Sequence, residues 1–192
     1  MNHCGTIAIE TGRLLLRPFR PEDAEAAFRN WMSDSTVTEF LRWPPHRDPA
    51  ESESVIRSWI GQYSRPDFYQ WAIELKETGE PVGSISVVEQ NEELDLVQIG
   101  YCIGSRWWHR GITSEAFAAI IPFLFGTVGA NRIEAVHDPD NPRSGAVMRR
   151  CGLRFEGTLR QADHSNRGIV DAAFWSILRS EWEAGQTSPA EA

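Results

Sequence analysis

The chain has 192 residues, of which 41% are hydrophobic and 24% are charged, and these fractions are close to those of an ordinary globular protein. This length and balance suit one domain, and they exclude a collagen-like repeat, a disulfide scaffold and a chain that is disordered throughout. The net charge is −8, from 19 basic and 27 acidic residues, and the arginines are scattered. A protein that binds a nucleic-acid backbone is therefore not expected.

No apolar run approaches the roughly 20 residues that a membrane-spanning helix needs, and the first residues lack the features of a secretory signal. The cysteines, Cys4, Cys102 and Cys151, are widely spaced and odd in number, which is typical of reduced thiols. The sequence has neither a CxxC pair nor a ligand-spaced histidine cluster, so no metal site is expected. These features predict a cytoplasmic protein without a membrane segment.

The first third of the chain predicts one strand followed by helices. The apolar segment 11–19 closes with a proline-containing turn and is typical of a strand. Pro21 suits the first turn of a helix, and acidic residues follow it near the positive end of the helix dipole. Three helices are expected here. The first covers residues 21–32, the second begins at the cap Ser33-Asp34 and ends at about Leu41, and the third covers residues 49–63.

The middle of the chain changes to a period of two residues. Apolar and polar residues alternate over 69–76, which is typical of a half-buried strand. A hairpin turn leads into a second strand at 81–89, and a third strand follows at 97–103. The apolar-faced segment after Gly104 predicts a long helix, in which Pro122 should loosen the last turn.

The last third predicts a strand at 131–137, a helix at 142–150 and two closing strands at 154–162 and 169–178. The order of elements is then βααα-βββ-αβ-αββ. This order fits an α+β or mixed α/β domain built on one sheet.

Residues 106–114 join the end of a strand, a basic segment with one glycine and the start of a helix. Backbone N–H groups are unpaired at a helix start and the dipole adds partial positive charge, so this junction is a candidate phosphate site. The alternative is an ordinary turn with solvated arginines. The motifs GxGxxG after the first strand, GxxxxGK[ST] and GxSxG are absent, which argues against NAD, ATP and the hydrolase elbow.

A second group of polar residues lies in DPDNPRSGAVMRRCGLRFEGTLR, residues 138–160. Asn141 precedes the predicted helix and Ser144 lies near its start. Residues of these types are favoured at helix starts for structural reasons alone, and capping is the preferred explanation for Asn141.

These segments resemble a known family. RWWHRGITSEAF (106–117) resembles the acetyl-CoA pyrophosphate loop of the GNAT N-acetyltransferase superfamily, whose pattern is [QR]xxGx[GA]. The N-x-x-S of residues 141–144 with CGLRFEGTLR resembles the next motif of that family, NxxSxxxxxxxGFxxEGxxR. The opening TGRLLLRPFRPEDAEAAF and the closing VDAAFWSILRSEW also match. The resemblance is to the branch with the RimJ/RimL ribosomal-protein acetyltransferases.

The resemblance implies a GNAT fold, with one mostly antiparallel sheet of about seven strands that splays in the middle and is flanked by helices. It implies an acetyltransferase domain over 10–182, an N-terminal extension at 1–9 and a disordered tail at 183–192. The splay would hold the pantetheine arm of acetyl-CoA, the co-substrate, along the strand edge. The implied cofactor-binding residues are Tyr101, Cys102, Ile103, Arg106, His109, Arg110, Gly111, Ile112, Thr113, Ser114 and Asn141.

Two positions depart from the family pattern. His109 stands where the family has its first motif glycine, and only Gly111 remains at the second glycine position. A side chain at residue 109 is acceptable if its φ is negative, because glycine is required only for unusual backbone angles.

The second departure concerns the general acid. The family's usual tyrosine corresponds to Met148, which has no proton to donate, and the RimJ/RimL branch implies Ser144 instead. For the general base, the resemblance implies Asp163, with Glu89 and Glu156 as competitors.

The expected function is acetyl transfer from acetyl-CoA to a primary amine, with the N-terminal α-amine of a ribosomal or other protein as one acceptor. The alternatives are a small cationic amine, such as a polyamine or an aminoglycoside, and a catalytically silent acyl-CoA-binding module. The acidic balance fits a cationic acceptor. Trp31, Trp43 and the loop 44–46 are expected to line the acceptor side. No metal, nucleic acid or membrane is expected as a partner, and the assembly is left open between a monomer and a homodimer.

Overall fold

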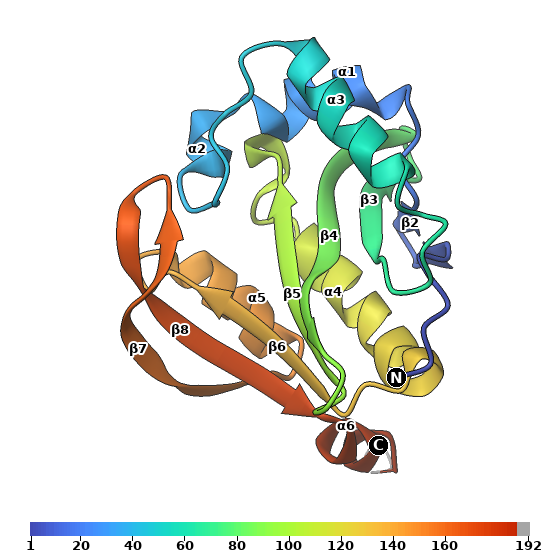
Figure 1. Cartoon of the computed structure of the whole chain (residues 1–192), viewed down its shortest axis with the longest axis vertical. Helices are drawn as coiled ribbons and strands as arrows, with labels where there is room; N and C mark the ends of the chain where they lie inside the picture. The colour runs from blue at the N-terminus through green and yellow to red at the C-terminus, as the bar shows by residue number, and fades with distance from the viewer. Residues whose placement is uncertain (188–192) are drawn as a thin grey trace.

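The computed structural model describes residues 1–187 as one open sheet with helices on both faces (Figure 1). The eight strands of this part of the chain lie in the order β1-β2-β3-β4-β5-β6-β8-β7. They are β1 (Ile9–Glu10), β2 (Leu14–Arg17), β3 (Gln70–Leu75), β4 (Glu80–Asn91), β5 (Leu96–Ile103), β6 (Arg132–His137), β7 (Arg154–Ser165) and β8 (Gly168–Leu178). The mixed α/β class is confirmed. The strand that the sequence did not predict is β1, whose two residues are too few to show a period.

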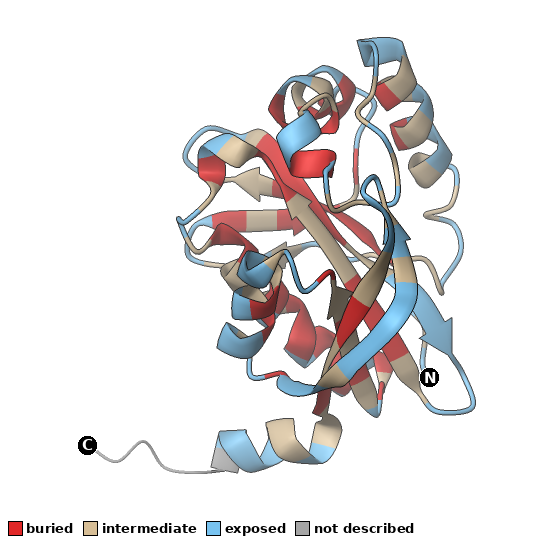
Figure 2. Cartoon of the chain, turned by 90° about the vertical axis from the view of Figure 1, so that its left-hand side faces the viewer, coloured by how far each residue is buried: buried red, intermediate tan, exposed pale blue. Residues whose placement is uncertain are grey.

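Helices cover both faces of the sheet. They are α1 (Asp23–Ala27), η1 (Phe28–Met32), α2 (Ser35–Thr38), α3 (Pro49–Ile60), η2 (Ser105–Trp107), α4 (Ile112–Pro122), η3 (Phe123–Val128), α5 (Pro142–Arg150) and α6 (Arg179–Thr187). One buried cluster joins α4, η3 and α5 to the sheet, and a second joins α1, η1 and α3 to its other face. Figure 2 shows these buried residues between the layers, whereas β7 is exposed along most of its length. None of the helices within residues 1–187 has the length and hydropathy of a membrane span.

The sheet splays between β5 and β6. All neighbouring strands are antiparallel except this pair, which is parallel and is bonded only between residues 96–98 and 132–134. Beyond these residues β5 continues to Ile103 and β6 to His137 without pairing to one another. A register shift between Val87 and Glu89 of β4 lies beside this point, and such a bulge bends its strand and adds twist. The expected splay is confirmed.

Two helix ends can be compared with their sequence signals. α4 ends at Pro122, and the chain continues as the π-helix η3 until Gly129, which has a φ of +86°. The loosened last turn is thus confirmed. At the C-terminus the expectation of a disordered tail from residue 183 was wrong for residues 183–187, which belong to α6. Trp182 anchors this helix by packing against Phe125, with ring centroids 5.5 Å apart. Residues 188–192 lie outside the described part of the chain.

Candidate active site

The turn between β5 and α4 presents a row of free backbone donors. Within residues 1–187, none of the amides of residues 109–114 has a hydrogen-bond acceptor, whereas the next amide, that of Glu115, donates to the Gly111 carbonyl at 3.0 Å. The partial positive charge of the α4 dipole lies at the same place. Free amides at the start of a helix form a binding site for an anionic group such as a phosphate.

This turn needs two left-handed residues. Gly111 has a φ of +72° and His109 has a φ of +62°. The condition under which a side chain was acceptable here, a negative φ at His109, is not met, because the turn keeps a left-handed backbone angle although the residue is a histidine. A residue with a Cβ in this region carries about 1–2 kcal/mol of strain.

We expect His109→Gly to be about 1 kcal/mol more stable to unfolding than His109→Ala, because alanine keeps the Cβ that is strained at this φ. Urea titrations of the two variants measure the difference. A His109→Gly protein that is less stable than His109→Ala would show that the turn does not require the left-handed angle.

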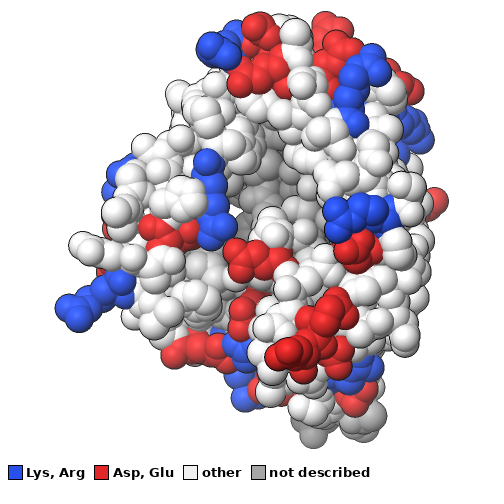
Figure 3. All heavy atoms as spheres, in the orientation of Figure 1, with Lys and Arg blue, Asp and Glu red and all other residues white. Residues whose placement is uncertain are grey.

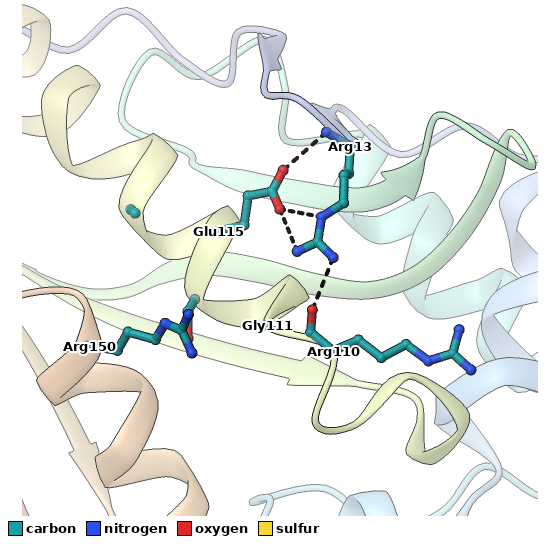
Figure 4. A pocket seen from close by; sticks show the side chains of 7 residues that line it. Arg13, Arg110, Gly111, Glu115 and Arg150 are labelled. Atoms are coloured by element: carbon teal, nitrogen blue, oxygen red, sulfur yellow. Dashed lines mark hydrogen bonds and ion pairs between the residues drawn. The ribbon is translucent and has the colours of Figure 1, made fainter.

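A pocket of about 320 Å³ lies beside the free amides (Figure 4). Its lining residues come from the loop before β2, from the start of α4 and from the end of α5, and they are Arg13, Arg110, Gly111, Ser114, Glu115, Ala118 and Arg150. Arg13, Ala118, Glu115 and Arg150 were not predicted as site residues, since they approach the turn only in the folded chain.

Ion pairing leaves this pocket with an excess of positive charge. The Arg13 Nε donates to Glu115 Oε2 at 2.7 Å, and its Nη1 donates to the Arg110 carbonyl at 3.0 Å. Partial burial alone would raise the pKa of Glu115, but hydrogen bonds from Thr11 and Arg13 hold that pKa below its ordinary value. Glu115 is therefore ionised and neutralises one arginine, which leaves the charges of Arg110 and Arg150 for a ligand.

The other residues expected to bind the cofactor contribute differently. The side chains of Ile112 and Thr113 are buried, so only their backbone amides face the turn. Arg106 lies over the ring of Trp107, with its Cζ 5.3 Å from the ring centroid, and neither Arg106 nor His109 lines the pocket.

The free edge of β5 leads away from this turn. Residues 99–103 have no β6 partner, and the Ile103 carbonyl accepts a hydrogen bond from Trp108 Nε1 at 3.0 Å. Tyr101 packs against Phe117 of α4, whereas the neighbouring Cys102 packs against the cluster on the opposite face. Cys102 can therefore offer the cofactor side its backbone but not its thiol.

Ser144 of α5 meets Tyr101 of β5 across the splay. The Tyr101 hydroxyl lies 2.9 Å from Ser144 Oγ and 2.9 Å from the Ser144 carbonyl oxygen. Burial raises the pKa of Tyr101 above its ordinary value, in spite of the hydrogen bond with Ser144, so the phenol stays protonated. Met148, one turn further along α5, is buried in the core and offers no proton.

Asn141 occupies the position before α5, but its side chain makes no capping hydrogen bond. Its carbonyl instead accepts from the Ser144 amide at 3.1 Å. Asn141 is thus the N-cap residue by position, as the preferred explanation expected, but without a side-chain cap, and within residues 1–187 its side-chain amide has no hydrogen-bond partner.

Two of the three candidate bases come together around one arginine. Arg42 Nη2 lies 2.8 Å from Asp163 Oδ1, and Arg42 Nη1 lies 3.6 Å from Glu89 Oε1. Glu156 lies further back along β7, where Arg132 donates to it at 2.9 Å and Ser176 at 2.7 Å. The bond from Arg132 holds the pKa of Glu156 below its ordinary value, which is the behaviour of a structural ion pair.

The surface is hollowed between the α1–α3 layer and the β7–β8 hairpin (Figure 3). Asn166 at the hairpin tip donates to the carbonyl of Thr38 at 2.8 Å and to that of Trp43 at 2.7 Å, so the hairpin is bonded to the end of α2 and to the segment after it. Trp43 is half-buried and packs beside His46, with ring centroids 5.3 Å apart. Trp31 is 0% exposed in the core, and its expected place on the acceptor side was wrong.

Comparison with known proteins gives the same family throughout. Residues 13–154 match the family described as "Acetyltransferase (GNAT) domain". An uncharacterised N-acetyltransferase of Bacillus licheniformis is 30% identical over 172 residues, which are 90% of this chain and 96% of that protein. The ribosomal protein uS5-alanine N-acetyltransferase of Escherichia coli is 39% identical over 88 residues, which are 46% and 45% of the two chains. A GNAT-family acetyltransferase of Bacillus anthracis, at 24% identity, has the same fold, with a TM-score of 0.80 over 91% of this chain and 100% of that one.

Proposed function

The chain belongs to the GNAT acetyltransferase family, and from this premise we propose that its acceptor is the α-amine at the N-terminus of a ribosomal or other protein. GNAT acetyltransferases use acetyl-CoA and transfer its acetyl group to an amine. The match to the uS5-alanine N-acetyltransferase supports a protein N-terminus as the acceptor. A small cationic amine is the second candidate, and the net charge of −8 favours it.

The observation that carries the cofactor assignment is the row of free amides at residues 109–114 beside an arginine-rich pocket. These amides would bind the pyrophosphate, and Arg110 and Arg150 would neutralise further phosphate charge. The free edge of β5 then leads from the turn toward Ser144 and would hold the pantetheine arm as an added strand.

When bound, acetyl-CoA supplies the thioester carbon that the amine attacks. An N–H group on the free edge of β5 would donate to the thioester oxygen as negative charge develops on it. Asp163, or its neighbour Glu89, would take the proton from the acceptor ammonium, since only the neutral amine has a lone pair for attack. Arg42 lies against both carboxylates and positions them side by side. Ser144 Oγ would give its proton to the sulfur as the carbon–sulfur bond breaks, and would recover a proton from water.

Replacement of Ser144 by alanine is expected to lower kcat by about tenfold to a hundredfold and to leave the acetyl-CoA Kd within about threefold. The lower part of the usual range for a general acid applies, because a thiolate is already a fair leaving group. Steady-state kinetics and calorimetric titration on one preparation measure both constants. If kcat is unchanged while the Kd or the Tm falls, Ser144 has a structural role only.

The acceptor is tested by following thiol release from acetyl-CoA with three sets of amines, namely N-terminal peptides, polyamines and aminoglycosides. Turnover is expected with peptides that have a free α-amine, and loss of turnover is expected when that amine is blocked. Turnover with polyamines or aminoglycosides alone would establish the second candidate. Binding of acetyl-CoA without turnover of any amine would identify a silent acyl-CoA-binding protein.

A further inference from the structure

The contact between Tyr101 and Ser144 joins two elements that are otherwise separated by the splay. Tyr101 lies on β5 beyond the last residue bonded to β6, and Ser144 lies in the first turn of α5, 43 residues further along the chain. The ring of Tyr101 is held by Phe117, with ring centroids 5.7 Å apart. The Tyr101 hydroxyl is therefore fixed from β5 and α4, independently of the helix that bears the serine.

The hydrogen atoms of this contact can be arranged in two ways. The Ser144 carbonyl can only accept, and each of the two hydroxyls has one proton. When Tyr101 donates to the carbonyl, the Ser144 hydroxyl donates to the Tyr101 oxygen and its proton is engaged. When Tyr101 donates to Ser144 Oγ, the serine proton is free to point at another acceptor. The two arrangements differ only by rotation of the hydroxyl hydrogens.

We propose that Tyr101 is a positioning residue that acts through Ser144, by donating to Oγ and so freeing the serine proton for the sulfur of the departing coenzyme A. This inference rests on the proposed role of Ser144 as the general acid. The Ser144 O–H bond breaks as the S–H bond forms, and the Tyr101 proton moves toward Oγ in the same step, because a phenol is a stronger acid than a serine hydroxyl. The hydrogen bond thus stabilises the partial negative charge that grows on Oγ, and water returns one proton to the pair. A hydrogen bond to a charged oxygen is stronger than one to a neutral oxygen, so this contact favours the transition state over the ground state.

A double-mutant cycle tests whether Tyr101 acts through the serine. Tyr101→Phe removes the hydroxyl and keeps the ring against Phe117, and it is expected to lower kcat about threefold to tenfold. The KM for the acceptor and the acetyl-CoA Kd should stay within about twofold, because the ring and the strand edge are unchanged. In the Ser144→Ala background the same change should alter kcat by less than about twofold, because the group through which it acts is gone.

The matched control is Tyr69→Phe. This variant also removes a buried tyrosine hydroxyl, one that contacts His3 and the Cys4 amide, and it should leave kcat unchanged. An equal loss from Tyr101→Phe in both backgrounds would overturn the inference and leave the acid role of Ser144 standing. No loss in the wild-type background would overturn it as well. If Ser144→Ala itself keeps full kcat, the acid role fails, and the inference fails with it.

Discussion

Replacing Gly111 by proline is expected to weaken acetyl-CoA binding more than about 100-fold, because several charge-assisted hydrogen bonds are lost together. Gly111 has a φ of +72°, whereas proline is held near −65° and has no N–H group. The residue is also the N-cap of α4, so its rearrangement would turn the amides of residues 112–114 away from a common point. Isothermal titration with acetyl-CoA measures the loss.

Gly129→Pro is the matched control for this change. Gly129 also has a positive φ, of +86°, but it follows η3, at the opposite end of the α4–η3 helix from Gly111, and it does not line the pocket. This variant loses stability in the same way but should bind acetyl-CoA with the wild-type affinity. If Gly111→Pro still binds acetyl-CoA normally, the pyrophosphate does not bind at this turn.

Arg17→Met is expected to lower the free energy of unfolding by about 3–5 kcal/mol, because it leaves buried carboxylates without their cation. Arg17 ends β2 with 4% of its surface exposed. Its Nη1 and Nη2 donate to the two oxygens of Asp23 at 2.7 and 2.8 Å, and its Nε donates to Glu74 at 2.6 Å. Burial alone would lower the pKa of Arg17, but the hydrogen bonds to both carboxylates hold it above its ordinary value.

Guanidinium unfolding measures the stability of Arg17→Met and of a control variant, Arg57→Met. Arg57 pairs with Glu53 on the exposed side of α3, and loss of this surface pair should cost less than about 1 kcal/mol. Similar losses in the two variants would mean that the contacts of Arg17 are worth no more than those of a surface pair.

Several elements could be predicted closely from local sequence. Pro142 at the start of α5 and Gly152 after its end, with a φ of +87°, bracket a helix whose observed bounds are those expected from the sequence. The alternation of apolar and polar residues likewise located β3. Such signals depend only on residues a few positions apart, so they can be recognised without knowledge of the fold.

The backbone at His109 shows where a local rule fails. A histidine prefers a negative φ, so from local sequence alone a side chain at residue 109 is acceptable only at such an angle. In the folded chain η2 and α4 are both anchored in the core, and the four residues between them must turn back within that span. The packing of the two flanking elements thus outweighs about 1–2 kcal/mol of local strain.

Local sequence was enough to locate most of the strands and helices and the turn with free amides, but not β1 or the end of α6, because side-chain period and capping residues act over a few positions. Which residues meet at the site could be seen only in the folded chain. Arg13 meets Arg110 across 97 residues, Tyr101 meets Ser144 across 43, and Arg42 meets Asp163 across 121. These contacts depend on strand register, on the bulge in β4 and on the angle at which α5 packs against the sheet. Those quantities are set by the sum of many distant contacts in the core, and no short stretch of residues encodes them.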